Sequence, residues 1–210
     1  MAATRELARS TVDNPVADRI LDGALACIGR VGLAKTTFDD VAKEAGLSRA
    51  TVYRHFAGRR PLLLGLVARE AGRLAEVVRA AVATTDTAAD ALVAAAGAAV
   101  EHLESVEALR FVLEHEPDIV MPFLALDRAN QAFAAAAAIA VELLEPWLDA
   151  PLAGRAGEWL ARLVTAYIVS LDCADGAPTC LADPDAVRAL VADFVVPGLT
   201  SISTRKGELS

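Results

Sequence analysis

Apolar residues recur three and four positions apart along most of this sequence, and no segment alternates polar and apolar residues. This spacing is that of an α-helix that buries one face, whereas alternation would indicate a β-strand. Alanine, the residue with the highest helix propensity, is abundant, and aromatic residues make up only 5% of the chain. We therefore predict an all-α protein. The expected helices cover residues 16–30, 38–45, 49–56, 61–84, 87–104, 105–115, 125–145, 154–172 and 184–196.

The chain is long and apolar enough to form a core by itself. It has 210 residues, 55% of them hydrophobic, and a core of that size needs neither a disulfide nor a metal to hold it together. The three cysteines, Cys27, Cys173 and Cys180, form no CxxC pair, so the sequence indicates no zinc site. We expect reduced thiols, no metal and no cofactor, with a Cys173–Cys180 disulfide as the alternative.

No segment is typical of an exported or membrane-spanning protein. The first residues lack the apolar stretch of a signal peptide. The longest uncharged apolar runs, residues 91–100 and 132–141, are shorter than the roughly 20 residues that cross a bilayer. We therefore expect a cytoplasmic protein without a membrane partner.

Charge is unevenly distributed along the chain. The whole chain has a formal net charge of −8, whereas its first 60 residues carry 10 basic and 7 acidic side chains, a net charge of +3. No acidic residue lies between Glu44 and Glu70, a stretch that holds several arginines. A basic segment on an acidic chain indicates one end that binds a polyanion such as nucleic acid. An ordinary solvated helix face is the alternative.

Residues 38–56 show the pattern of two short helices joined by a tight turn. Thr37, followed three residues later by Asp40, is typical of a helix start, because each side chain can hydrogen-bond the other residue's backbone. Gly46 is typical of a helix end. Ser48 can cap the next helix. The pattern predicts a helix-turn-helix.

The second of these helices has two chemically different sides. Val52 and Phe56, four positions apart, are predicted to face the core. The opposite side mixes guanidinium, hydroxyl and phenol groups, which suit base edges and phosphates in a major groove. A generic helical hairpin is the alternative. The residues on or near this side are Arg49, Ala50, Thr51, Tyr53 and Arg54.

The string from Arg19 to Val67 resembles the DNA-binding domain of the TetR family of transcriptional regulators. Matching pieces include AGLS at residues 45–48 and TVYRHF at residues 51–56. The resemblance implies a homodimeric repressor, with an N-terminal three-helix helix-turn-helix head on a larger helical ligand-binding and dimerisation domain. One departure is that Arg59 stands where the family usually has a lysine that touches a phosphate, and an arginine can also do so. A second is that Pro61 replaces the usual acid, so the next helix can start differently.

The sequence pattern predicts a domain division, and the resemblance implies a set of DNA contacts. A flexible arm at 1–14 precedes the DNA-binding domain at 15–60, the ligand-binding and dimerisation domain follows at 61–203, and a frayed tail ends the chain at 204–210. Two of the implied contacts, Tyr53 and His55, have the alternative of packing inside the head. The implied base-edge contacts are Arg49, Ala50, Thr51 and Arg54, and the implied phosphate contacts are Thr37, Tyr53, His55, Arg59 and Arg60.

A two-fold dimer reads a palindrome, because its heads meet the same half-site in opposite orientations. We therefore expect the partner to be double-stranded DNA that carries a palindromic operator. The helices near 154–172 and 184–196 carry wide apolar stripes, and in the family such a pair packs against its symmetry mate. The alternative is that these stripes only close the domain's own core.

The region at 87–145 is where we expect a small-molecule effector to bind. Its alanines and glycines leave space between helices, and a mainly apolar lining with a few polar anchors favours a lipophilic effector. Small side chains can equally mean tight packing with no cavity. The candidate ligand-binding residues are His102, Arg110, Phe111, His115, Phe123, Arg128, Asn130 and Phe133.

Two other kinds of function remain as alternatives. One is a regulator that is controlled by a partner protein or has no small-molecule ligand. The other is an enzyme, but the sequence contains no glycine-rich phosphate loop, GxSxG elbow or HExxH motif. His115, between Glu114 and Glu116, could act as a general base, although a solvated helix end explains it more simply. We expect no enzymatic activity.

Overall fold

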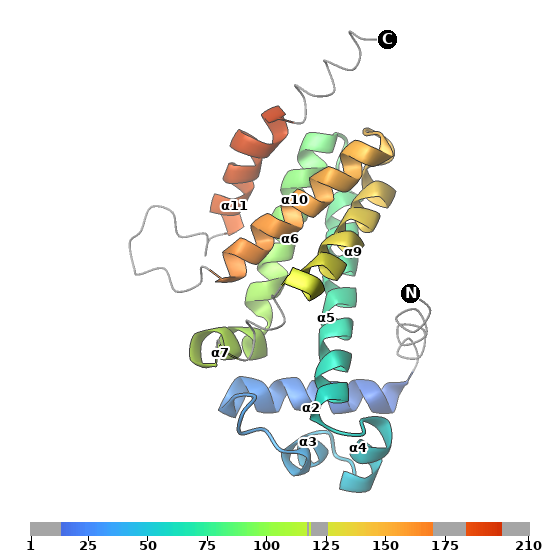
Figure 1. Cartoon of the computed structure of the whole chain (residues 1–210), viewed down its shortest axis with the longest axis vertical. Coiled ribbons are helices and arrows are strands. Elements are labelled where there is room, and N and C mark those ends of the chain that lie inside the picture. The colour runs from blue at the N-terminus through green and yellow to red at the C-terminus, as the bar shows by residue number, and fades with distance from the viewer. Residues whose placement is uncertain (1–13, 117, 119–125, 170–183, 199–210) are drawn as a thin grey trace. The chain divides into compact units, whose positions relative to one another are not determined.

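A computed structural model describes residues 14–116, 118, 126–169 and 184–198 of the chain. Every regular element in this part is helical (Figure 1), which confirms the predicted all-α class. The elements are α2 (Pro15–Val31), α3 (Phe38–Glu44), α4 (Arg49–His55), α5 (Arg59–Val82), α6 (Ala88–Ser105), α7 (Glu107–His115), α9 (Leu126–Leu144), α10 (Ala150–Val169), α11 (Pro184–Leu190) and the π-helical turn η1 (Val191–Val195). The expected arm before residue 14 and the expected tail lie outside the described residues.

Two helices begin two or more residues earlier than the sequence predicts. Helix α5 begins at Arg59 instead of residue 61, which is possible because the first N–H groups of a helix have no partner within it, so Pro61 loses no hydrogen bond. Helix α10 begins at Ala150 instead of residue 154. The carboxylate of Asp149 accepts a hydrogen bond from the N–H of Leu152 at 2.9 Å and so caps this earlier start.

The chain folds into two compact units. The first unit comprises residues 1–73 and 106–119, and the second comprises residues 74–105 and 120–210. Helix α5 therefore contributes its first part to one unit and its last part to the other. Helix α7 belongs to the first unit, far in sequence from the helices that it joins.

The core of the first unit is built on one face of α2. Its residues at helical spacing are buried, α3 and α7 pack against this helix, and further side chains of α3, α4 and α5 are buried as well. Burial of each large aliphatic side chain contributes about 1.5–3 kcal/mol, so this face holds the short helices in place. The buried side chains include Ile20, Leu21, Ala24, Cys27, Ile28, Val41, Val52, Leu62 and Leu66.

The second unit packs alanine-rich helices closely. Gly157 of α10 lies so near α9 that an added Cβ would be 2.8 Å from the backbone oxygen of Ala136. Helix α11 and η1 bury Val187 and Val191 against this core. Of the expected interface stripes, Trp159 and Phe194 keep 51% and 75% of their surface exposed. The stripes therefore close the unit's own core in part and leave large apolar side chains outside it.

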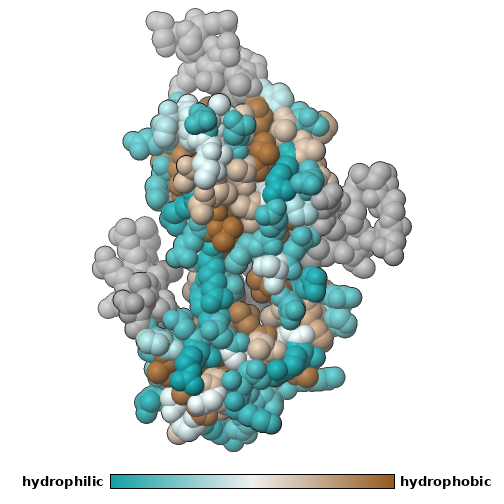
Figure 2. All heavy atoms as spheres, turned by 180° about the vertical axis from the view of Figure 1, so that it is seen from behind, coloured by the Kyte–Doolittle hydropathy of each residue, from teal (hydrophilic) through white to brown (hydrophobic). Residues whose placement is uncertain are grey.

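Hydrophilic residues cover most of the face that Figure 2 shows. On the face that Figure 2 shows, hydrophobic residues reach the surface in small areas among hydrophilic ones. Within the described ranges we find no helix with the length and apolar character needed to cross a membrane.

Candidate nucleic-acid interface

The helix-turn-helix begins with a reciprocal cap on α3. The hydroxyl of Thr37 accepts the N–H of Asp40 at 3.2 Å, and the Asp40 carboxylate accepts the N–H of Thr37 at 3.1 Å. Hydrogen bonds from the Thr37 hydroxyl and backbone lower the pKa of the Asp40 carboxyl. A carboxyl with a lowered pKa stabilises the fold at neutral pH, and this contribution is lost as the pH falls through that pKa. The predicted cap is confirmed.

The turn between α3 and α4 is held by side chains that hydrogen-bond its backbone. Gly46 has a φ of +62°, the left-handed region that favours glycine. The guanidinium of Arg19, on α2, donates to the carbonyl of Ala45 at 2.7 Å. The hydroxyl of Ser48 accepts the N–H of Thr51 at 3.1 Å and so caps α4, as predicted. The two short helices are thereby held in one arrangement on α2.

Helix α4 presents the predicted polar side to solvent. Val52 and Phe56 are buried, which confirms their predicted orientation toward the core. The residues that the sequence predicts to contact base edges lie on the accessible side of the helix. Arg49, Ala50 and Arg54 are exposed, and Thr51 is half-buried. This row could enter a major groove without a change in the fold.

A stack of side chains surrounds Arg49 at the start of α4. The ring of Tyr53 stacks on Phe38 of α3 with 4.6 Å between centroids. The guanidinium of Arg49 lies over the same Tyr53 ring, 5.4 Å from its centroid. Its Nη1 atom is 3.1 Å from the carboxylate of Asp39. The side chain of Tyr53, and then the charge of Asp39, raise the pKa of Arg49. Sequence reasoning did not single out Asp39.

Three of the predicted phosphate contacts line one cavity in the first unit. Thr37, Tyr53 and Arg59 surround a cavity of about 330 Å³, together with apolar residues such as Ile28 and Leu62. The structure brings these three residues together from the start of α3, from α4 and from the start of α5, in that order.

Among the predicted phosphate contacts, Arg59 and His55 each lie against another residue of the first unit. The guanidinium of Arg59 donates to the backbone carbonyl of Leu33. The side chains of His55 and Asn14 lie 3.4 Å apart. This contact fits the alternative in which His55 hydrogen-bonds inside the unit. Arg60 is exposed.

Helix α7 and the residue after it contact the loop that leads into the helix-turn-helix. The carboxylate of Glu116 accepts the N–H of Leu33 at 2.7 Å and the N–H of Ala34 at 3.0 Å. Phe111 lies against Gly32, where an added Cβ would be 2.7 Å from the ring. Because one carboxylate holds two backbone N–H groups, α7 is anchored to this loop.

The predicted ligand-binding residues lie in both units. Phe111 and His115, on α7 of the first unit, stack with 4.4 Å between ring centroids, and Arg110 is exposed on the same helix. In the second unit, His102 lies on α6, and the Phe133 ring lies 4.8 Å from the guanidinium of Arg162. Phe123 and the side chains of Arg128 and Asn130 lie outside the described residues.

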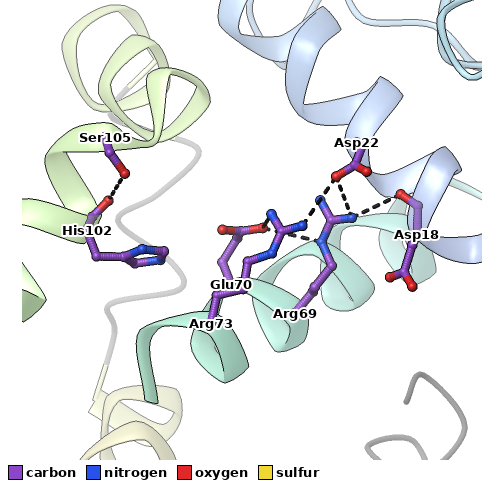
Figure 3. Close-up of polar contacts among 7 residues, drawn as sticks. All are labelled: Asp18, Asp22, Arg69, Glu70, Arg73, His102 and Ser105. Carbon is purple, nitrogen blue, oxygen red and sulfur yellow. Dashed lines mark hydrogen bonds and ion pairs between the residues drawn. The ribbon is translucent and has the colours of Figure 1, made fainter. Parts of the chain in front are cut away.

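An arginine network on α5, missed by sequence reasoning, ties α5 to α2 (Figure 3). Arg69 is only 9% exposed and donates to the backbone oxygen of Asp18 at 3.0 Å. It also pairs with Asp22 at 2.9 Å and with Glu70 at 3.3 Å. Arg73 reaches the same two carboxylates. A single, mostly enclosed arginine side chain thus bridges two helices of the first unit.

Comparison with known proteins supports the family resemblance seen in the sequence, and it covers most of the chain. A model of the bacterial regulatory proteins of the tetR family matches residues 20–66. The uncharacterized HTH-type transcriptional regulator Rv1255c of Mycobacterium tuberculosis is 30% identical over 197 residues, which cover 89% of this chain and 87% of that protein.

Solved structures show the same fold at lower sequence identity. The TetR family repressor AlkX from a Dietzia strain, implicated in biodegradation of n-alkanes, matches with a TM-score of 0.66 and 20% identity, over 90% of this chain and 96% of that one. The transcriptional regulator FadR from Bacillus subtilis, solved in complex with stearoyl-CoA, matches with a TM-score of 0.59 and 18% identity, over 84% of this chain and 97% of that one.

Proposed function

Since this chain belongs to the TetR family of helix-turn-helix transcriptional regulators, we propose that it is a cytoplasmic, homodimeric repressor that binds a palindromic operator and is released by a small lipophilic effector. The observation that carries the DNA-binding part is the accessible side of α4, which displays Arg49, Ala50 and Arg54 on a helix whose other side is buried. That side combines charge for phosphates with groups that can read bases.

The DNA contacts divide by chemistry. Arg49, Ala50, Thr51 and Arg54 meet base edges, because they lie on the side of α4 that can enter the groove. Thr37, Tyr53 and Arg59 meet phosphates around the cavity that they share, and Arg60 adds a further positive charge. His55 and Arg59 already have neighbours in the first unit, Asn14 and the backbone carbonyl of Leu33, and Arg59 keeps further N–H donors for a phosphate.

A homodimer accounts for the apolar side chains left outside the second unit's core. Trp159 of α10 and Phe194 of η1 are large and exposed, and such side chains are commonly buried in an interface between subunits. We propose that helices near 154–172 and 184–196 form this interface. The two DNA-binding surfaces would then be related by a two-fold axis, as a palindrome requires.

The proposed effector is a lipophilic molecule that binds in the region at 87–145. The complex of FadR with stearoyl-CoA and the link of AlkX to n-alkane degradation support this chemistry. The close packing of α9 against α10 at Gly157 favours the second candidate, a regulator controlled by a partner protein or without a small-molecule ligand. The two differ in whether a purified lipophilic compound releases the protein from DNA.

Substituting Arg54 by alanine tests the proposed DNA contact. We expect Arg54→Ala to weaken binding to an operator selected with the wild-type protein by about 10- to 100-fold, because an arginine that grips a guanine edge contributes about 1–3 kcal/mol. Fluorescence anisotropy with labelled duplex measures the effect. Arg79→Ala, which removes an exposed arginine of the second unit, is the matched control. Wild-type affinity in Arg54→Ala would contradict the assignment.

A further inference from the structure

We propose that Asp39 is a specificity-determining residue: its carboxylate holds the guanidinium of Arg49 in place for a base edge and disfavours binding to DNA of any other sequence. This inference rests on the proposed operator binding. It concerns a residue on α3, outside α4, and assigns a DNA-related role to a negative charge.

The geometry fixes Arg49 from two sides. Asp39 is the second residue of α3 and Arg49 is the first residue of α4. The carboxylate of Asp39 binds Nη1 of Arg49 at 3.1 Å, while the guanidinium carbon lies 5.4 Å from the centre of the Tyr53 ring. Tyr53 is in turn stacked on Phe38. The arginine therefore rests on a platform that both short helices build.

Stability does not explain this ion pair. The side chains of Arg49 and Asp39 are 62% and 61% exposed. An ion pair so exposed contributes little to stability, because water and salt screen it. A flexible arginine also loses rotamer freedom when it is held in one orientation. In this proposal, the advantage of holding the guanidinium is that it is oriented for a second partner.

Holding one nitrogen of a guanidinium leaves donors for another partner. Arginine carries five N–H donors in a planar fork, and the bond to Asp39 is made at Nη1 alone. The remaining donors are presented in a defined direction at the start of α4. A guanine edge offers two acceptors that such a fork can meet at once.

The negative charge of Asp39 acts differently on the two kinds of binding. Phosphates are present at every DNA site, so an exposed carboxylate on this surface weakens binding to all sequences. The oriented Arg49 recovers affinity only where the correct base pair is present. Discrimination between partners commonly combines such a repulsive element with an attractive one. Asp39 thus widens the difference between operator and other DNA.

The test compares Asp39→Asn with Glu44→Gln in the full chain. Glu44 lies at the other end of α3 and pairs with Arg30 of α2. Glu44→Gln therefore removes the same charge from a similar exposed pair. Affinities for the selected operator and for a scrambled duplex of equal length are measured over a series of salt concentrations. We expect Asp39→Asn to tighten scrambled-DNA binding and to lower the operator-to-scrambled ratio by about three- to tenfold. Glu44→Gln should leave the ratio unchanged.

A double variant shows whether Asp39 acts through Arg49. In an Arg49→Ala background, Asp39→Asn should no longer reduce discrimination at the base pair that Arg49 reads, whereas its effect on scrambled DNA persists. An equal loss of discrimination with and without Arg49, or an unchanged ratio in Asp39→Asn, would overturn the inference while the proposed function stands. A wild-type protein that does not distinguish operator from scrambled duplex would overturn both.

Discussion

Replacing Gly32 with alanine is expected to destabilise the first unit by about 2–4 kcal/mol and to weaken operator binding with it. Gly32 ends α2 with φ +85° and ψ 163°, a backbone conformation that is essentially restricted to glycine. An added Cβ would also lie 2.7 Å from both the Glu116 carboxylate and the Phe111 ring. Alanine therefore strains the backbone and pushes α7 off the loop before α3.

Two optical signals separate this effect from global unfolding. Trp147 and Trp159 both belong to the second unit, so tryptophan fluorescence reports that unit, while circular dichroism reports helices of both. In a urea titration, Gly32→Ala should shift part of the helical signal to lower urea. Gly72→Ala, a change within α5 with open space around the glycine, is the control and should be neutral or slightly stabilising. An unshifted helical transition in Gly32→Ala would contradict this account of the loop.

Replacing Gly157 with alanine is expected to destabilise the second unit by about 1–3 kcal/mol, even though alanine favours helices more than glycine does. The added Cβ would overlap the Cβ of Ala140 and lie 2.8 Å from the backbone oxygen of Ala136. Neither atom belongs to a side chain that can rotate away, so α9 and α10 must separate.

Gly154 provides the matched control on the same helix. An added Cβ at Gly154 would be 3.5 Å from its nearest neighbour, Val141, an ordinary contact. We expect Gly154→Ala to be neutral or to stabilise by up to about 1 kcal/mol. Urea unfolding followed by tryptophan fluorescence, with Trp159 two residues from Gly157, measures both. Equal stability of the two variants would mean that α9 and α10 do not pack closely at Gly157.

The helix-turn-helix could be predicted because its signals are local. The cap formed by Thr37 and Asp40 needs only residues three positions apart, and Gly46 and Ser48 mark the turn by their own backbone preferences. The buried side of α4 follows from the spacing of Val52 and Phe56. Nothing distant in the sequence was needed for any of these features.

The contacts that sequence reasoning missed join distant parts of the chain. Glu116 is 83 positions from Leu33, whose N–H it holds, and neither residue carries a local pattern that marks the pair. For the same reason, the local pattern around Phe111 and His115 carries no sign that α7 packs with α2. Arg69 likewise reads as an ordinary helix charge until α5 is placed beside α2.

Asp39 represents a middle case. It is ten positions from Arg49, across a turn whose geometry the sequence already predicted. Opposite charges at the exposed starts of α3 and α4 were therefore a signal that could have been used. The starts of α5 and α10 were predicted too late. A pattern of apolar residues does not fix the first residue of a helix, because a cap such as Asp149 can allow an earlier start.

The most direct test of the central claim is selection of bound fragments from random duplex DNA with the purified protein, followed by titration of the selected sequence against salt. We predict an inverted repeat with half-sites about one helical turn or somewhat more apart, bound as one dimer per site, with an affinity that falls steeply as salt rises. Weak binding without sequence preference would contradict the account that α4 reads an operator in a two-fold dimer.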